Sequence, residues 1–151
     1  MNKEIKGFNV RVYGIILNSE NQILLSDEFQ LGMKMTKFPG GGLKFGEGTI
    51  ECLKREAIEE FNQEIEVLEH FYTLDYFQPA LYYSEYQLLS IYYRAHFTAP
   101  VSFKISTKPF DFQEMKNGNM SFRWKSLDNL REEDLTLPVD KKVVTMLKEN
   151  Y

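Results

Sequence analysis

The pattern of apolar and polar positions along the chain predicts a domain that is rich in β-strands. Apolar residues alternate with polar ones, or run together for several positions, in segments bounded by turn residues, which is typical of strands. The predicted strands cover residues 8–17, 22–26, 34–38, 65–77, 85–97 and 120–126. We expect the first strand to pair with the second, because only a short polar turn separates them.

Helical spacing of apolar residues marks the segments 49–61 and 139–149, and a short helix is predicted at 127–135. In the first of these helices the predicted N-cap is Thr49, with the carboxylate of Glu51 in the first turn. The stripe expected to face the core consists of Ile50, Leu53, Ala57 and Phe61. These elements predict a fold of the α/β class (α+β type), with a mixed sheet flanked by helices.

The face of the helix 49–61 next to this stripe is acidic. At about 100° per residue, Glu56, Glu59 and Glu60 fall within roughly a quarter-turn of one another. Each like-charge pair destabilises a helix by about 0.2–0.5 kcal/mol, and a hard divalent cation with oxygen ligands would replace this repulsion by attraction. The alternative is a solvated acidic face without a ligand, because charge runs are common on helices.

A glycine-rich loop directly before the helix favours the metal site over the solvated face. The glycines at 40–42 permit positive φ and close approach of the backbone to a ligand, and Pro39 stiffens the start of the loop. The loop lacks the Lys-Ser/Thr ending of a P-loop and the spacing of a dinucleotide fingerprint. From Gly41 to Glu60 the loop and helix together read G-x5-E-x7-R-E-x2-E-E.

The 23 residues from Gly41 to Gln63 resemble the signature box of the Nudix hydrolases, G-x5-E-x7-R-E-U-x-E-E-x-G-U, where U is a bulky apolar residue. Asn62 stands at the place of the last glycine, and Gln63 at that of the last apolar residue. Asn is the next-best residue for a left-handed C-cap, so we expect the turn to persist. The flanking segments 38–42 and 122–124 are also similar to the family.

The resemblance implies a Nudix-like α/β/α sandwich with a mixed β-sheet, in one domain over residues 1–151. It implies hydrolysis of a nucleoside diphosphate linked to another moiety, with Mg²⁺ or Mn²⁺ as cofactor. Carried over by position, the metal ligands would be Glu56, Glu59, Glu60 and the Gly41 carbonyl. Arg55 and Glu47 would orient the loop and the helix. A box glutamate, Glu59 or Glu47, is favoured as the general base, and Glu114 on a later loop is the alternative.

Composition narrows the class of protein. The chain has 151 residues, of which 43% are hydrophobic and 26% charged, and this is typical of one folded domain. No apolar run reaches membrane-spanning length and no signal peptide opens the chain, so we expect a cytoplasmic protein without a membrane partner. Its single cysteine, Cys52, can form no internal disulfide. The net charge of −4, without a basic stripe, argues against a nucleic-acid partner.

Substrate choice rests on residues outside the box. Arg11 and Arg94 are lone cations in apolar strands and are candidate contacts to phosphate or ribose, although an outward position suits Arg94 equally. Pro79 lies 16 residues after Gln63, a spacing that resembles the ADP-ribose-hydrolysing subgroup. The predicted substrate is therefore ADP-ribose or a nucleotide sugar, with a (deoxy)nucleoside triphosphate second. A non-catalytic Nudix module that binds a nucleotide or a protein is the third reading. A small-molecule nucleotide is the expected partner, and homodimerisation is left open.

Overall fold

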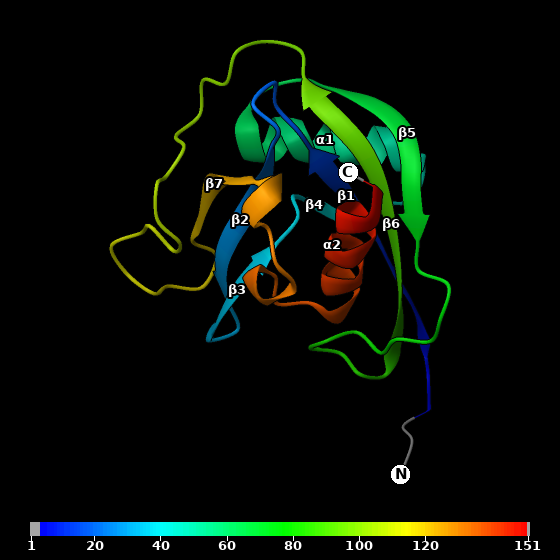
Figure 1. The fold of residues 1–151 in the computed structure, drawn as a ribbon. Helices are drawn as coiled ribbons and strands as arrows, with labels where there is room; N and C mark the ends of the chain where they lie inside the picture. The colour runs from blue at the N-terminus through cyan, green and yellow to red at the C-terminus, as the bar shows by residue number, and fades with distance from the viewer. Residues whose placement is uncertain (1–3, 151) are drawn as a thin grey trace.

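Two β-sheets carry the fold, with one α-helix behind them and another in front (Figure 1). The computed structural model describes residues 4–150. The first sheet has the strand order β4-β1-β6-β5, formed by Gly40–Gly42, Gly7–Ile16, Tyr86–Phe97 and Ile65–Thr73. The second has the order β3-β2-β7, formed by Met33–Lys37, Gln22–Gln30 and Met120–Ser126. The helices α1 and α2 cover Thr49–Phe61 and Pro138–Asn150. This arrangement confirms the predicted fold class.

The first sheet is mixed, because β1 pairs parallel with β6 and antiparallel with the short β4. The expected pairing of the first two strands is wrong. In the described part of the chain the two predicted strands share one isolated antiparallel bridge, between Leu17 and Ile23. Strand β2 instead lies between β3 and β7. The reason is that both strands are buried on both faces. Consecutive residues of a strand point to opposite faces, and consecutive residues are buried in β1, such as Ile15 and Ile16, and also in β2. Each strand therefore takes an inner place in a separate sheet.

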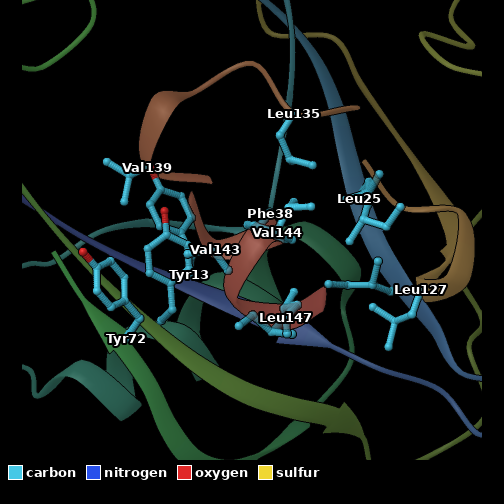
Figure 2. Packing of buried hydrophobic residues seen from close by; sticks show 14 of the residues in the cluster. Tyr13, Leu25, Phe38, Tyr72, Leu127, Leu135, Val139, Val143, Val144 and Leu147 are labelled. Atoms are coloured by element: carbon cyan, nitrogen blue, oxygen red, sulfur yellow. The ribbon is translucent and has the colours of Figure 1, made fainter. Parts of the chain in front are cut away.

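Two apolar clusters fill the space between the sheets and the helices. On the α2 side, Val143, Val144 and Leu147 pack against Tyr13 and Phe38 (Figure 2). On the α1 side, the cluster joins helix and strand residues, among them Leu53, Ala57, Phe61, Val12 and Ile16. Fully burying a side chain such as Leu or Val contributes about 1.5–3 kcal/mol. The two helices are therefore fixed to opposite faces of the same sheet.

Helix α1 has the predicted bounds, but its first turn differs from the prediction. Gly48, and not Thr49, is the N-cap residue. The Glu51 carboxylate accepts a hydrogen bond from the Gly48 N–H at 3.1 Å. The Thr49 hydroxyl lies 2.6 Å from the Tyr93 hydroxyl, so its hydrogen bond ties the helix to β6 instead of capping it.

The buried stripe of α1 is also rotated slightly from the predicted one. Ile50 is 42% exposed, whereas the neighbouring Cys52 is fully buried and takes the expected place of Ile50 in the core. At the C-terminal end, Asn62 adopts the left-handed conformation with φ 53°, and its N–H donates to the Ile58 carbonyl. The helix therefore ends as predicted, without the glycine of the family pattern.

Two other segments differ from their predicted form. Strand β5 ends at Thr73, earlier than predicted, and the residues from 127 to 135 form two 3₁₀ turns, Leu127–Asn129 and Glu132–Asp134, in place of a helix. Leu130 and Leu135 in the segment 127–135 are both fully buried. Their separation along the chain does not match the spacing of three or four residues that places apolar side chains on one face of an α-helix. Across residues 4–150, no helix is long and apolar enough to cross a membrane.

Candidate active site

Arg55 on α1 links the glycine-rich loop to the helix. Its Nε and Nη2 atoms donate to the two carboxylate oxygens of Glu47 at 3.0 and 2.8 Å. The same Nη2 donates to the Gly42 carbonyl at 3.0 Å. The hydrogen bonds from Arg55, and then from the Lys44 backbone, lower the pKa of Glu47 to about 2. Arg55 and Glu47, which the family resemblance implies as the residues that orient the loop and the helix, are therefore in two-point contact, and Glu47 is left a weak base.

The acidic face itself begins with two carboxylates that share the other end of Arg55. Its Nη1 atom lies 3.0 Å from Glu56 and 3.2 Å from both oxygens of Glu59. Glu56 is largely buried, whereas the side chain of Glu59 is 51% exposed. Lys44 lies 3.9 Å from Glu59, close enough for a weak ion pair at the surface. Glu59 is therefore the member of the face that water reaches most easily.

Glu60 is the third member of the face and is only partly exposed. Burial raises the pKa of Glu60 to about 8, and the positive charge of Lys37 only partly offsets this effect. The nearby carboxylates of Glu28 and Glu56 raise it further. A carboxylate held this far from its ordinary pKa gains stability from any cation that approaches it.

Gly41 and its neighbours, which the sequence predicted as a loop, form the short strand β4 paired with β1, and they bring the backbone against the helix. A Cβ atom at Gly41 would lie 2.3 Å from a carboxylate oxygen of Glu56, and one at Gly40 would lie 2.1 Å from the Val12 carbonyl oxygen. At Gly42 the nearest neighbour would be Arg11 at 3.6 Å, an ordinary contact. Of the three glycines, only Gly40 has positive φ, at 151°. Close approach, and not a left-handed conformation, therefore requires glycine at position 41.

The acidic face fits a divalent cation in donor type but does not enclose one. Among residues 4–150, no three acidic, histidine or cysteine side chains are grouped closely enough to hold an ion alone. Glu56 and Glu59 instead contact Arg55, while burial destabilises the charged form of Glu60 beside them and raises its pKa to about 8. An open, carboxylate-only face suits Mg²⁺, which commonly takes one or two carboxylates together with substrate phosphates.

A cavity of about 380 Å³ is linked to this face through its lining residues Arg11, Glu28 and Lys37, whose charges act on Glu60. It is bounded by strands of both sheets, by the loop after β5 and by the start of α2, and its polar lining includes Arg11, Tyr13, Glu28, Lys37, Tyr82 and Tyr92. A mostly apolar cavity with a few convergent polar groups is the usual form of a small-molecule site. Its size suits one nucleoside-sized group.

Arg11 stands between the cavity and the acidic face. Its Nε atom donates to the Tyr13 hydroxyl at 3.0 Å, which fixes the guanidinium against the cavity wall. Burial opposes the charge of Arg11, but Tyr13 and the carboxylates of Glu56 and Glu28 outweigh it and raise the pKa. Since Glu56 belongs to the acidic face and Glu28 to the cavity, Arg11 remains charged within electrostatic reach of both.

Lys37 and Glu28 form a buried pair that the sequence did not reveal. The ammonium lies 3.2 Å from Oε2 of Glu28 and donates to the Gly40 carbonyl at 3.4 Å. Both side chains are more than nine-tenths buried. Neither residue is distinctive in the sequence, and Glu28 lies beyond the predicted strand 22–26, whereas β2 continues to Gln30. A buried pair of this kind contributes little net stability, but it places two opposite charges in the wall of the cavity.

Asp140 in the first turn of α2 is a second residue that the sequence did not reveal. It is fully buried, accepts a hydrogen bond from the Tyr92 hydroxyl at 2.5 Å and accepts a longer one from the Phe38 N–H at 3.4 Å. Burial raises the pKa of Asp140 to about 6. Because Phe38 directly precedes Pro39 and the glycines, Asp140 ties α2 to the start of the glycine-rich loop.

Two residues proposed from the sequence lie apart from this site. Arg94 pairs with Glu69 at 3.3 Å and lines a different hollow beside Trp124. Glu114 is exposed on the loop between β6 and β7, where its carbonyl accepts from the Asn119 amide at 2.8 Å. The structure therefore brings together Arg11 and the residues of the box, but not Arg94 or Glu114.

A family model described as the NUDIX domain matches residues 7–147. No curated protein matches the sequence. A NUDIX hydrolase from Nitrosomonas europaea has a similar structure, with a TM-score of 0.69 at 20% identity over 95% of this chain and 90% of that one. A MutT protein from Methanosarcina mazei Go1 gives a TM-score of 0.67 at 17% identity, covering 96% of both chains. At such identities the structural likeness concerns the fold.

Proposed function

The chain belongs to the Nudix hydrolase family, and we propose that it hydrolyses the pyrophosphate of a nucleoside diphosphate linked to a second group, such as ADP-ribose or a nucleotide sugar. The observation that carries this proposal is the position of Arg11 between the acidic face and the cavity. In this arrangement the nucleoside end occupies the cavity and the pyrophosphate reaches the carboxylates of α1.

Substrate binding follows from the charges on this path. The Arg11 guanidinium donates to oxygens of the pyrophosphate, and its hydrogen bond to Tyr13 keeps the fork in place before the substrate arrives. The charge of Lys37, which also lines the cavity, is paired with that of Glu28. The Arg11 guanidinium therefore contacts the phosphates from the side of the cavity, and this contact orients the phosphorus atom toward α1.

The acidic face would hold Mg²⁺ or Mn²⁺ through Glu56, Glu59, Glu60 and the Gly41 carbonyl. When bound, such an ion neutralises phosphoryl oxygens and lowers the pKa of a water molecule. Arg55 and Glu47 keep the loop carbonyls and the helix carboxylates in register, because they join Gly42 to α1 through short hydrogen bonds.

Among the box glutamates, Glu59 is best suited to accept the proton of the attacking water at a carboxylate oxygen. Glu47 is engaged at both oxygens by Arg55 and has a pKa of about 2. Glu59 is more exposed, and its contacts with Arg55 are longer at 3.2 Å. A general base must lie within reach of water and be free to take a proton, and Glu59 meets both conditions better than Glu47.

A coupled assay distinguishes this proposal from the alternative, in which the substrate is a (deoxy)nucleoside triphosphate. Attack on the pyrophosphate of ADP-ribose yields a nucleoside monophosphate and a sugar phosphate, so inorganic phosphate appears only after a phosphatase is added. A nucleoside triphosphate would instead yield pyrophosphate, detected with pyrophosphatase alone. Signal only with triphosphates would replace our proposal by the second one. Nucleotide binding without any metal-dependent cleavage would favour the binding module.

A further inference from the structure

The carbonyls on either side of Gly41 both accept hydrogen bonds from cationic side chains. Nη2 of Arg55 donates to the Gly42 carbonyl at 3.0 Å, and Nζ of Lys37 donates to the Gly40 carbonyl at 3.4 Å. The backbone at the proposed ion site is therefore in contact with two positive charges that belong to the chain itself.

Lys37 is the buried member of these two cations. Its ammonium lies 3.2 Å from Oε2 of Glu28, an oxygen that also accepts the Ser26 hydroxyl at 2.9 Å. It also lies 5.4 Å from the centre of the Tyr13 ring. Burial opposes the charge, but Glu28 and, more weakly, Tyr13 and Glu60 outweigh it and raise the pKa of this lysine. Lys37 therefore stays charged and is held in place.

The charge of Lys37 reaches the acidic face through Glu60. Burial raises the pKa of Glu60, and among the neighbouring charges Lys37 lowers it most. The other two carboxylates of the face are paired with Arg55, at 3.0 Å for Glu56 and 3.2 Å for Glu59. Each member of the face thus has a positive side chain nearby, and a divalent cation that binds there must overcome the repulsion of these charges.

We propose that Lys37 acts as a tethered cation: it keeps the affinity of the free chain for a divalent cation low, so that the ion binds firmly only together with the phosphates of the substrate. A like charge beside a cation site opposes the ion, whereas each substrate phosphate brings negative charge that offsets this opposition. The inference rests on the proposed function in taking the acidic face as the ion site.

A purely structural role of the buried pair predicts a different pattern. Removing either partner leaves one buried charge uncompensated, so loss of Lys37 and loss of Glu28 would both weaken ion binding. A tethered cation predicts opposite effects, because one substitution removes a positive charge and the other removes a negative one. A divalent ion carries two charges and a proton one, so loss of Lys37 favours the ion over the proton that competes for Glu60.

Titration of the full chain with Mn²⁺, without nucleotide and at one fixed pH, tests the inference. Electron paramagnetic resonance detects the free ion and gives the affinity without any turnover. We expect K37M to bind Mn²⁺ at least about tenfold more tightly than the wild type, and E28Q at least about tenfold more weakly. K37R keeps the charge and should remain within about threefold of the wild type.

K125M is the matched control. Lys125 also lies on a strand and pairs with an acidic side chain, Asp134 at 3.7 Å, but it does not line the cavity. Its loss changes the net charge of the chain by the same amount as K37M, so Mn²⁺ affinity should be unchanged if the effect of Lys37 is local.

Two further variants keep the test decisive. K37Q replaces K37M if the latter does not fold, because its amide can still donate to Glu28 while the charge is absent, and the same gain is expected. Adding E60Q to the charge-free variant should abolish the gain, since the ion then lacks a ligand on the acidic face. Unchanged or weaker Mn²⁺ binding without the Lys37 charge, or a gain that survives E60Q, would overturn the proposal.

The outcomes also separate this inference from the proposed function. If K37M tightens Mn²⁺ binding but the wild type cleaves no pyrophosphate, the role of Lys37 stands and the proposed reaction is lost. If the wild type hydrolyses ADP-ribose with Mn²⁺ while K37M binds the ion no more tightly, the reaction stands and the role of Lys37 is lost.

Discussion

The carboxylate of Glu56 occupies the space that a side chain at Gly41 would require, because a Cβ atom there would lie 2.3 Å from its Oε1. The backbone of β4 and the acidic face of α1 are therefore in direct contact. Glu56 is also held by Arg55 at 3.0 Å. Its position in the site thus depends on the absence of a side chain at position 41.

Replacement of this glycine should separate folding from activity. In Gly41→Ala the new methyl group meets the far end of a flexible side chain, so Glu56 can move away and the fold should persist. A displacement of about 1 Å can cost about 100-fold in rate, and we expect a loss of that order in kcat/KM. Gly42→Ala is the matched control, since its Cβ would make only an ordinary contact at 3.6 Å. Circular dichroism and steady-state kinetics of both variants check this, and equal activities would contradict it.

Glu60→Gln should lower activity and raise stability. Losing one ligand of the proposed metal site should reduce kcat by about 100-fold or more, the usual size of one transition-state contact. The pKa of Glu60 is about 8 in the folded chain against an ordinary 4.5. The folded state then binds the proton more tightly than the unfolded state, so stability falls as pH rises between these values.

The stability gain of Glu60→Gln should therefore be small near pH 4.5 and grow toward pH 8 without metal, reaching the order of 1–3 kcal/mol. Urea unfolding of both proteins in the presence of a chelator measures it. Added Mg²⁺ should stabilise the wild type more than the variant. A gain independent of pH would show that burial of this carboxylate is not the cause.

The Arg55 and Glu47 pair should respond to acid in the opposite sense. Glu47 has a folded pKa of about 2, below its ordinary 4.5, so its contribution to stability is present above 4.5 and is lost as pH falls through 2. Glu47→Gln should be less stable than the wild type at neutral pH and should show a flatter acid limb. Thermal unfolding across this range checks the difference, which should vanish at the lowest pH.

Much of this site could be predicted from the sequence because it is local. The spacing within one helix places the acidic residues together, and Arg55 and Glu47 meet across the loop that directly precedes that helix. Glu28, Lys37 and Asp140 could not be predicted in the same way. They reach the site only through the pairing of β2 with β3 and the docking of α2, and these depend on contacts between distant parts of the chain.

The two candidate arginines illustrate the same limit. As isolated cations in apolar strands, Arg11 and Arg94 are equivalent in the sequence, but the parallel register sets Arg11 beside Ser90 and Arg94 beside Ile15, several residues farther along the sheet. We expect Arg11→Gln to reduce kcat/KM by about 10- to 100-fold, as for loss of one charge-assisted hydrogen bond. Arg94→Gln should change it far less. Comparable losses in both variants would show that the substrate extends beyond the cavity.

Asp140 should also make the stability of the folded chain depend on pH. Its folded pKa of about 6 exceeds the ordinary 3.8, so the folded state holds the proton and stability falls as pH rises between these values. Asp140→Asn should remove this part of the slope. Urea unfolding of the two proteins at several pH values in this range measures the difference, and parallel curves would contradict the assignment.

The central claim is metal-dependent cleavage of a pyrophosphate that joins a nucleoside to a second group. Chromatographic separation of the products of ADP-ribose and nucleotide sugars, with Mg²⁺ or Mn²⁺ and then with a chelator, tests it most directly. The account predicts a nucleoside monophosphate and a sugar phosphate in equal amounts, formed by the wild type only with metal and reduced about 100-fold in Glu60→Gln. Intact substrates in every metal condition, or equal turnover by Glu60→Gln, would contradict it.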